Sequence, residues 1–224
     1  MQAINAMPEP ANGGQHARRW QDVIALAQVG IAETLARAIA QGTLTRNCYQ
    51  DWLAMESVAC RIGALSLDAV AGWHVSQPAL RATALAWALE LREHAQFAAR
   101  DVRVIDGMAG APPPTMAQWH AFVCAAAASQ RAGEALGSVL LHGHLFAGPM
   151  RAVTATILEM PFSRGGRYLA ASLLRAAQPA TAREEREALC NAYSTSALAV
   201  GAQRAAGWYR AALSVVTSTP ETAP

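Results

Sequence analysis

The chain has 224 residues, of which 53% are hydrophobic and 15% are charged, and its formal net charge is +2. This length is enough for one large domain, and high hydrophobicity with low net charge excludes a mostly disordered chain. The small net charge gives no indication of a nucleic-acid partner, and no apolar run approaches the roughly 20 uninterrupted residues of a membrane span.

The N-terminal stretch MQAINAMPEPANGGQHARRW contains no apolar segment of the kind that a signal peptide needs. The four cysteines are far apart and form no C-x-x-C motif: Cys48, Cys60, Cys124 and Cys190. Each lies in an apolar context with helical periodicity. We therefore expect reduced core cysteines and a cytoplasmic protein.

Three helices are expected in the first half of the chain. The first covers about residues 20–41, where apolar residues recur at helical spacing and Gly42 is placed to end the helix. Thr45 is a candidate N-cap for the second helix. The sequence HVSQP then interrupts the pattern, and Pro78 falls in the first turn of the third helix.

The second half of the chain continues with shorter segments. After the loop DGMAGAPPP, a T-x-x-Q capping box that begins at Thr115 opens a fourth helix, and a fifth reaches about residue 147. A further helical segment extends to residue 160, and a sixth helix covers about 168–177. The last helix is expected to run to about residue 216.

No segment alternates between apolar and polar residues for long enough to form a strand, and no repeat at solenoid periods occurs. We therefore predict an all-α fold, a single bundle of six to eight helices around one core. The bundle is expected at 19–217, between flexible tails at 1–18 and 218–224.

The third helix carries polar residues where an apolar seam is expected. One row, spaced by seven residues, is apolar: Ala84, Leu91, Ala98 and Ile105. The neighbouring row contains Leu80, Trp87, His94 and Asp101. Residues seven apart lie nearly one above the other on a helix, so both rows should face the core. Glu90, one turn before His94, extends the polar ridge.

Two interpretations of this ridge are open. At the edge of the core, His94 would bond Glu90, and Asp101 would meet Arg100 or Arg103. Inside the bundle, the ridge would instead line a cavity, because helical bundles build iron sites from inward-facing Glu and His. Asp101 lies about 10 Å along the helix axis from His94, which favours a proton donor or a ligand to a second ion.

Other helices offer partners for such a cavity. Glu56 lies near the buried side of the second helix, although a glutamate at the rim of the core would show the same spacing. Glu134 and His142 lie on the fifth helix. His142 and His144 are two residues apart and point to nearly opposite sides, so at most one of them should enter a given cavity. The alternative for each histidine is a structural role in the core.

The sequence RGGR places Arg164 and Arg167 at the entry of a helix. Arginine side chains and free backbone N–H groups in such a place can hold a carboxylate or a phosphate. The alternative is an ordinary solvated turn. No G-x-G-x-x-G, P-loop, G-x-S-x-G or H-E-x-x-H motif occurs in the chain.

Three segments resemble the heme-oxygenase-like superfamily of helical enzymes. IAQGTLTRNCYQDWLAMES (39–57) is similar to the corner between the first two helices in its thiaminase II and PQQ-synthase-like branch. ELREHAQFAARDVRVIDG (90–107) resembles the E-x-x-x-H…D stretch of its iron-dependent oxidases. HGHLFAG (142–148) resembles the E-G-S-T-L-G-G distal-helix signature of bacterial heme oxygenases.

The resemblance implies roles for individual residues. Glu56 takes the place of the pyrimidine-binding aspartate of thiaminase II. Gly143 and Gly148 match the distal-helix signature, and together with His144 they would contact a cofactor. His142 replaces the glutamate of that signature.

The sequence also departs from the patterns of the superfamily. Between Trp20 and Gln41 there is no histidine to serve as the proximal ligand of a heme oxygenase. No histidine follows His144, although the di-iron branch takes further ligands from a late helix. Cys124 lies too early to match the catalytic cysteine of the thiaminase branch.

The leading hypothesis is a cytoplasmic oxidoreductase, an iron-dependent oxygenase or oxidase of a small molecule, with non-heme iron favoured over heme. The predicted metal ligands are Glu90, His94, Glu134 and His142. Asp101 and Glu56 are the predicted catalytic residues.

Three alternatives stay open. They are a heme oxygenase with unusual axial ligation, a metal-free hydrolase of the thiaminase II type with Glu56 gripping a heterocycle, and a non-catalytic binding protein of the same fold. We expect neither a nucleic acid nor a membrane as partner, and the sequence leaves room for a homodimer.

Overall fold

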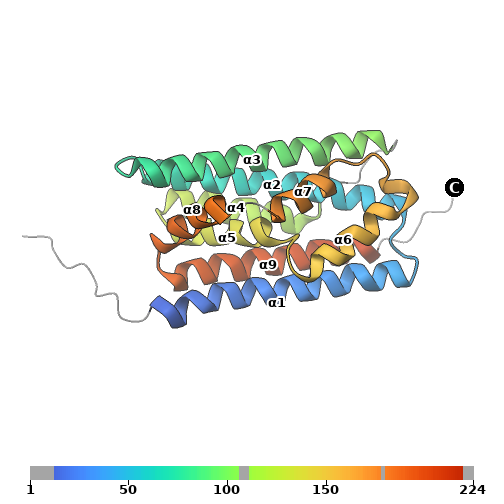
Figure 1. The fold of residues 1–224 in the computed structure, drawn as a ribbon, viewed down its shortest axis with the longest axis horizontal. Coiled ribbons are helices and arrows are strands. Elements are labelled where there is room, and N and C mark those ends of the chain that lie inside the picture. The colour runs from blue at the N-terminus through green and yellow to red at the C-terminus, as the bar shows by residue number, and fades with distance from the viewer. Residues whose placement is uncertain (1–12, 106–110, 178–179, 219–224) are drawn as a thin grey trace, which may run out of the picture.

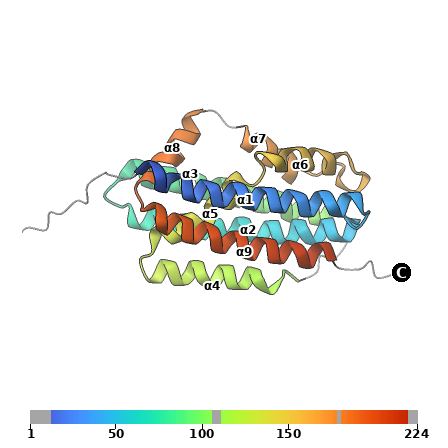
Figure 2. The same ribbon diagram turned by 90° about the horizontal axis from the view of Figure 1, so that it is seen from below.

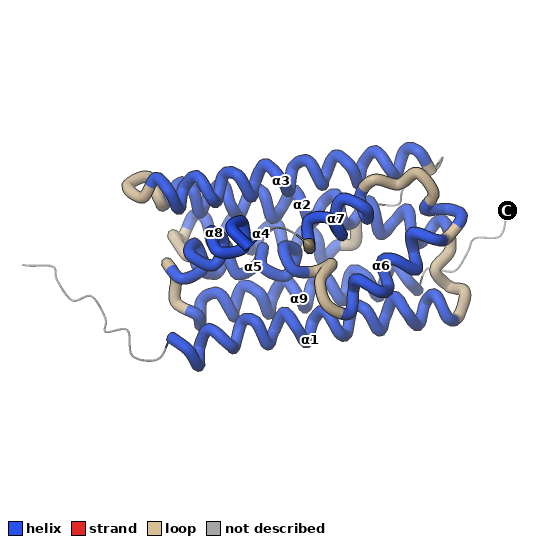
Figure 3. Tube along the Cα trace, in the orientation of Figure 1, coloured by secondary structure: helices blue, strands red, loops and turns tan. Residues whose placement is uncertain are grey.

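The structure is a computed structural model that describes residues 13–105, 111–177 and 180–218 (Figure 1). These residues form nine α-helices and one short 3-10 helix, with no strand among them (Figure 3). The prediction of an all-α bundle is confirmed. The elements are α1 (Gly13–Ala40), α2 (Arg46–Trp73), α3 (Pro78–Val104), α4 (Pro114–Ala128), α5 (Ala132–His144), α6 (Pro149–Glu159), η1 (Pro161–Ser163), α7 (Tyr168–Ala176), α8 (Ala180–Asn191) and α9 (Thr195–Ser218).

The long helices α1, α2, α3 and α9 run along the length of the bundle, and α5 lies among them (Figures 1 and 2). The helix α2 packs along α3, and α9 packs along both α1 and α5. The short helices α6, α7 and α8 cover one face of this arrangement, and α4 covers the opposite face (Figure 2). The residues of the candidate site lie under the face that carries α7.

The heptad row of α3 is buried as predicted. Ala84, Leu91 and Ala98 are fully buried, and Ile105 is nearly so. The neighbouring row is buried as well, because Trp87, His94 and Asp101 are all largely removed from solvent. Both rows therefore face the interior, which makes the polar members of the second row the exceptions to explain.

Within the described residues, one segment, 20–40 of α1, is long and apolar enough to cross a membrane by length and composition. The core helix of a soluble protein passes the same test. The inner row of this segment includes Ile24, Ile31 and Leu35, which are buried, and α1 packs along α9 and α6. One face of this segment is therefore part of the core of the bundle.

The helices α5 and α9 approach each other so closely that glycine is required on both. A Cβ atom on Gly137 would overlap the carbonyl oxygen of Leu198, and one on Gly201 would overlap that of Glu134. The two glycines let the backbones touch, and this contact fixes the position of α5 along the bundle axis. The position of His142, near the end of α5, depends on this crossing.

The structure differs from the expected helix boundaries in two ways. The helix α1 begins at Gly13, within the expected tail at 1–18. The expected last helix is broken into α8 and α9, because Ser194 caps a new start: its Oγ accepts a hydrogen bond from the N–H of Ala197 at 3.4 Å. The break raises the number of α-helices above the expected six to eight.

Of the two predicted N-caps, one is confirmed and one is wrong. The Oγ1 of Thr45 accepts a hydrogen bond from the N–H of Cys48 at 3.3 Å and caps α2. Thr115 does not cap α4, which begins with Pro114, and its buried hydroxyl has no hydrogen-bond partner among the described residues. Three successive prolines at 112–114, the last of which is the first residue of the helix, fix its start in place of the capping box.

Candidate functional site

The fifth helix, which was expected to reach about residue 147, is broken within the segment 142–148. The helix α5 ends at His144, and α6 begins at Pro149. Gly148, just before the proline, has a φ of 55°, which residues with a side chain rarely adopt. The break turns the chain away from the bundle axis and places His142, Gly143 and Phe146 around a cavity.

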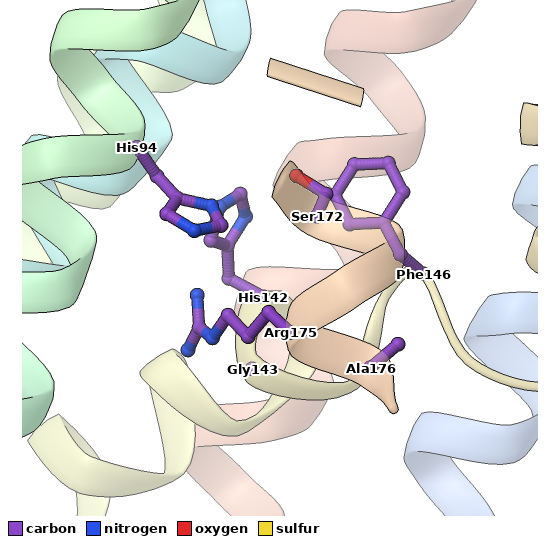
Figure 4. Close-up of a pocket in the computed structure, with 7 residues that line it drawn as sticks. All are labelled: His94, His142, Gly143, Phe146, Ser172, Arg175 and Ala176. Carbon is purple, nitrogen blue, oxygen red and sulfur yellow. The ribbon is translucent and has the colours of Figure 1, made fainter. Parts of the chain in front are cut away.

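We call this space the polar cavity. It lies between α3, α5 and α7 and has a volume of about 10 Å³, which is room for about one water molecule. The side chains of His94, His142 and Arg175 point toward one another there (Figure 4). The lining residues are His94, His142, Gly143, Phe146, Ser172, Arg175 and Ala176.

Glu56 lies behind the polar cavity and is completely buried on α2. The indole Nε1 of Trp52 donates a hydrogen bond to its Oε1 at 3.0 Å, and the hydroxyls of Tyr168 and Tyr209 donate to its two carboxyl oxygens. Burial raises the pKa of Glu56 to about 7, and these three hydrogen bonds only partly oppose the effect. The carboxyl group therefore changes its charge near neutral pH.

His142 separates Glu56 from the polar cavity. Its Nδ1 lies 3.7 Å from the Oε2 of Glu56, and its Nε2 lies 2.9 Å from the Sγ of Cys60. Burial lowers the pKa of His142 to about 3, so the imidazole is neutral at physiological pH. Burial also raises the pKa of Cys60 well above its usual value. The cysteine is therefore a thiol and a poor nucleophile.

Two arginines share one carboxylate at the outer side of the cavity. The Nη2 of Arg186 bonds both carboxyl oxygens of Glu90, at 2.8 and 2.6 Å, and the Nε of Arg175 lies 3.3 Å from Oε2 of the same group. Two guanidinium groups against one carboxylate leave one positive charge in excess. The side chain of Arg175 is only 7% exposed, so this charge is held largely out of water.

Four buried polar atoms of the residues that line the polar cavity lack a hydrogen-bond partner among the described residues. They are the Nδ1 of His142, which faces Glu56, the Nε of Arg175, which faces Glu90, the Oγ of Ser172 and the Nη2 of Arg175. Buried polar atoms are nearly always paired, since leaving one unpaired costs about 1–3 kcal/mol. The Oγ of Ser172 and the Nη2 of Arg175 therefore indicate a place for a polar ligand or for water in this cavity.

His94 completes the wall formed by α3. Its ring meets the ring of Tyr168 edge to face, with 6.1 Å between the ring centroids. Burial, together with the nearby charge of Arg175, lowers the pKa of His94 to about 4. Both cavity histidines are therefore neutral at physiological pH, and Arg175 is the charged group of the cavity.

Asp101 and the RGGR turn were separate features of the sequence, and they meet in the structure. The Oδ2 of Asp101 accepts hydrogen bonds from the backbone N–H groups of Arg167 at 2.7 Å and Tyr168 at 2.8 Å. Gly166 has no side chain to crowd this oxygen. The turn therefore does hold a carboxylate, that of Asp101, which caps α7 from α3 and so positions Tyr168 against Glu56.

The four predicted metal ligands are not brought together. His94 and His142 share the polar cavity, but Glu90 is paired with arginines, and Glu134 pairs with Arg131 at 3.0 Å at the start of α5. No group of three or more His, Cys, Asp or Glu suited to a metal occurs in the part of the chain that the structure describes. These residues do not fit a shared iron ion, and iron stays a prediction from the sequence.

The three predicted cofactor-binding residues lie on or beside the break. Gly143 lines the polar cavity, and a Cβ atom there would lie 2.6 Å from the ring of Trp87, so close packing requires the glycine. His144 is exposed, and its ring lies 6.0 Å from that of Trp20. The carbonyl oxygen of His144 accepts a hydrogen bond from Gln28. Of the three, only Gly143 borders the cavity.

Sequence reasoning missed the residues that α7 contributes. Tyr168, Ser172 and Arg175 follow one another at intervals of four and three residues, which places them on one face of the helix. This face meets the bundle, because Tyr168 and Ser172 are buried. A serine and an arginine on the inner face of a short helix were the signal that could have identified them.

Comparison with known proteins assigns no family to this chain. No protein-family model matches the sequence, and no curated protein or solved structure gives a significant match. The resemblance to the heme-oxygenase-like superfamily therefore stays a prediction.

Proposed function

We propose that this chain is an acid–base enzyme that acts on a small anionic molecule in the polar cavity. The observation that carries the proposal is that the Oγ of Ser172 and the Nη2 of Arg175, which have no hydrogen-bond partner among the described residues, belong to the lining of a cavity beside a buried carboxyl group. A glutamate whose pKa is about 7 is suited to both donating and accepting a proton at physiological pH.

The charge of the cavity favours an anion. His94 and His142 are neutral, whereas Arg175 and Arg186 share Glu90 as their one acidic salt-bridge partner among the described residues. A carboxylate or phosphate oxygen would pair the free Nη2 of Arg175, and the hydroxyl of Ser172 would donate a second hydrogen bond. Such a ligand is larger than one water molecule, so α7 moves outward from α5 when the substrate enters.

In this proposal, protonated Glu56 gives its proton to the leaving group of the substrate. The proton passes by way of His142, which borders both Glu56 and the cavity. The carboxylate then recovers a proton from the water that adds to the substrate, which makes the reaction a hydrolysis. Among the functions predicted from the sequence, the metal-free hydrolase with Glu56 at its site agrees best with this arrangement. The iron-dependent oxidoreductase remains the competing prediction, and the positive charge of Arg175 beside His94 and His142 speaks against it.

Thermal unfolding tests the anion site directly. We expect sodium acetate to raise the midpoint of unfolding above that in sodium chloride of equal ionic strength, because a ligand of the folded state stabilises it. The variant Arg175→Gln should lose this response. The matched control is Arg164→Gln, which removes an exposed arginine just before α7 and should respond like the wild type. Equal responses of all three proteins, or no response of the wild type, would overturn the proposal.

A further inference from the structure

A groove lies on the opposite face of α3. It runs between α2 and α3 and has a volume of about 640 Å³, within the range of about 300–1,000 Å³ that small-molecule sites occupy. Ala95 and Ala99, one turn apart, contribute small side chains to its lining, and this leaves the space open. Arg103 follows His94 by nine residues and therefore points about 180° away from it around the helix. The groove is thus separate from the polar cavity.

Four arginines line this groove, which we call the arginine groove: Arg61, Arg92, Arg100 and Arg103. Arg61 donates from Nη2 to the Oγ of Ser57 at 3.0 Å, and Arg92 pairs with Asp68 at the surface. No salt bridge to a described residue involves Arg100 or Arg103. Four positive side chains in one groove are a strong concentration of charge in a chain whose net charge is only +2.

The spacing of these arginines suits an extended anion. From Arg92 to Arg103, the groove follows α3 for about 16 Å, at 1.5 Å per residue. A guanidinium group binds phosphate oxygens in pairs through its planar N–H groups, so several arginines in a row match several phosphates in a row. The ring of Phe97 also lines the groove and offers an apolar surface to the remainder of the ligand.

We propose that the arginine groove binds a phosphorylated small molecule that carries two or more phosphate groups. The phosphates pair with Arg100, Arg103 and Arg61, and the organic part lies against Phe97 and the alanines. This site is independent of the proposed acid–base function, because none of its residues lines the polar cavity.

Isothermal titration with sodium tripolyphosphate tests the groove at low and at moderate ionic strength. We expect binding to the wild type that weakens with salt, and a loss of affinity of at least about tenfold in the double variant Arg100→Gln/Arg103→Gln. The matched control is Arg37→Gln/Arg81→Gln, which removes the same charge from exposed positions outside the groove and should change the affinity less than about twofold. Circular dichroism verifies that both variants fold.

Three results would overturn the proposal. They are no binding of tripolyphosphate to the wild type, an equal loss in both double variants, and binding of a short RNA through these arginines in the absence of tripolyphosphate binding. An equal loss in both double variants would mean that the net charge of the protein attracts tripolyphosphate without a defined site. The third would make the groove part of a nucleic-acid surface.

Discussion

The Nδ1 of His142 lies 3.7 Å from the Oε2 of Glu56, and neither side chain is more than 1% exposed. If both groups were ionised in this place, each charge would have lost its hydration, which costs free energy. Burial instead lowers the pKa of His142 to about 3 and raises that of Glu56 to about 7. The pair is therefore neutral in mildly acidic solution, and Glu56 is the member that titrates near pH 7.

The titration of Glu56 predicts how stability depends on pH. Its pKa rises from 4.5 to about 7 on folding, so the folded state binds the proton more tightly. This contribution to stability is complete below pH 4.5 and is lost as the pH rises through about 7. Denaturant unfolding should show that the stability of the wild type, relative to Glu56→Gln, falls by roughly 3 kcal/mol across this window.

The comparison with Glu56→Gln is needed because the cavity histidines act in the opposite direction. The pKa of His94 and that of His142 lie below 6.5 in the folded protein, so their contribution is lost as the pH falls below about 6.5. Both proteins keep these histidines, and the difference isolates Glu56. A difference that stays flat from pH 4.5 to 7 would show that Glu56 titrates with its ordinary pKa.

Asp101 is expected to act on stability through α7. In Asp101→Ala, the N–H groups of Arg167 and Tyr168 lose their acceptor, which should lower the free energy of unfolding by about 2 kcal/mol. Asp101→Asn retains a carbonyl oxygen and should lose less. Urea unfolding measures both values. If both variants are as stable as the wild type, the contact between α3 and α7 is not a cap.

Because of the close crossing of α5 and α9, replacing two glycines of α9 by alanine is expected to have opposite effects on stability. Gly201→Ala forces apart two backbones in contact and should destabilise the protein by about 3 kcal/mol. Gly207 has no atom near its missing Cβ, so Gly207→Ala should stabilise by up to about 1 kcal/mol, because alanine favours the helix. Thermal unfolding compares the two, and effects of the same sign would argue against the crossing.

The fold class and the buried faces of the long helices could be predicted because they follow from local periodicity. The row Ala84, Leu91, Ala98 and Ile105 is an example. The break between α8 and α9 was not predicted, because the chain has neither glycine nor proline at Tyr193 and Ser194 to indicate the end of a helix. Besides the cap by Ser194, a contact over a long sequence distance holds the break, in which the hydroxyl of Tyr193 lies 2.6 Å from the Nε2 of His74.

The site was predictable only in part. Glu56, His94 and His142 could be identified as polar residues on apolar faces, and Glu56 proved to be at the centre rather than at the rim. The partners of these three residues could not be identified from the sequence, because pairing across helices depends on how the helices are placed. Nothing local links Asp101 to the RGGR turn, 66 residues later, or Glu90 to Arg186, 96 residues later.

The central claim, that the anion of the polar cavity lies beside a titrating Glu56, is tested most directly by proton uptake on binding. Acetate is titrated calorimetrically into the protein at pH 7, in two buffers with different ionisation enthalpies. A nearby anion raises the pKa of Glu56, and a rise of about one unit implies uptake of roughly 0.4 proton per acetate bound. Glu56→Gln should bind acetate without this uptake, and Arg175→Gln should not bind it. Acetate binding with no proton uptake by the wild type, or with the same uptake by Glu56→Gln, would contradict the account.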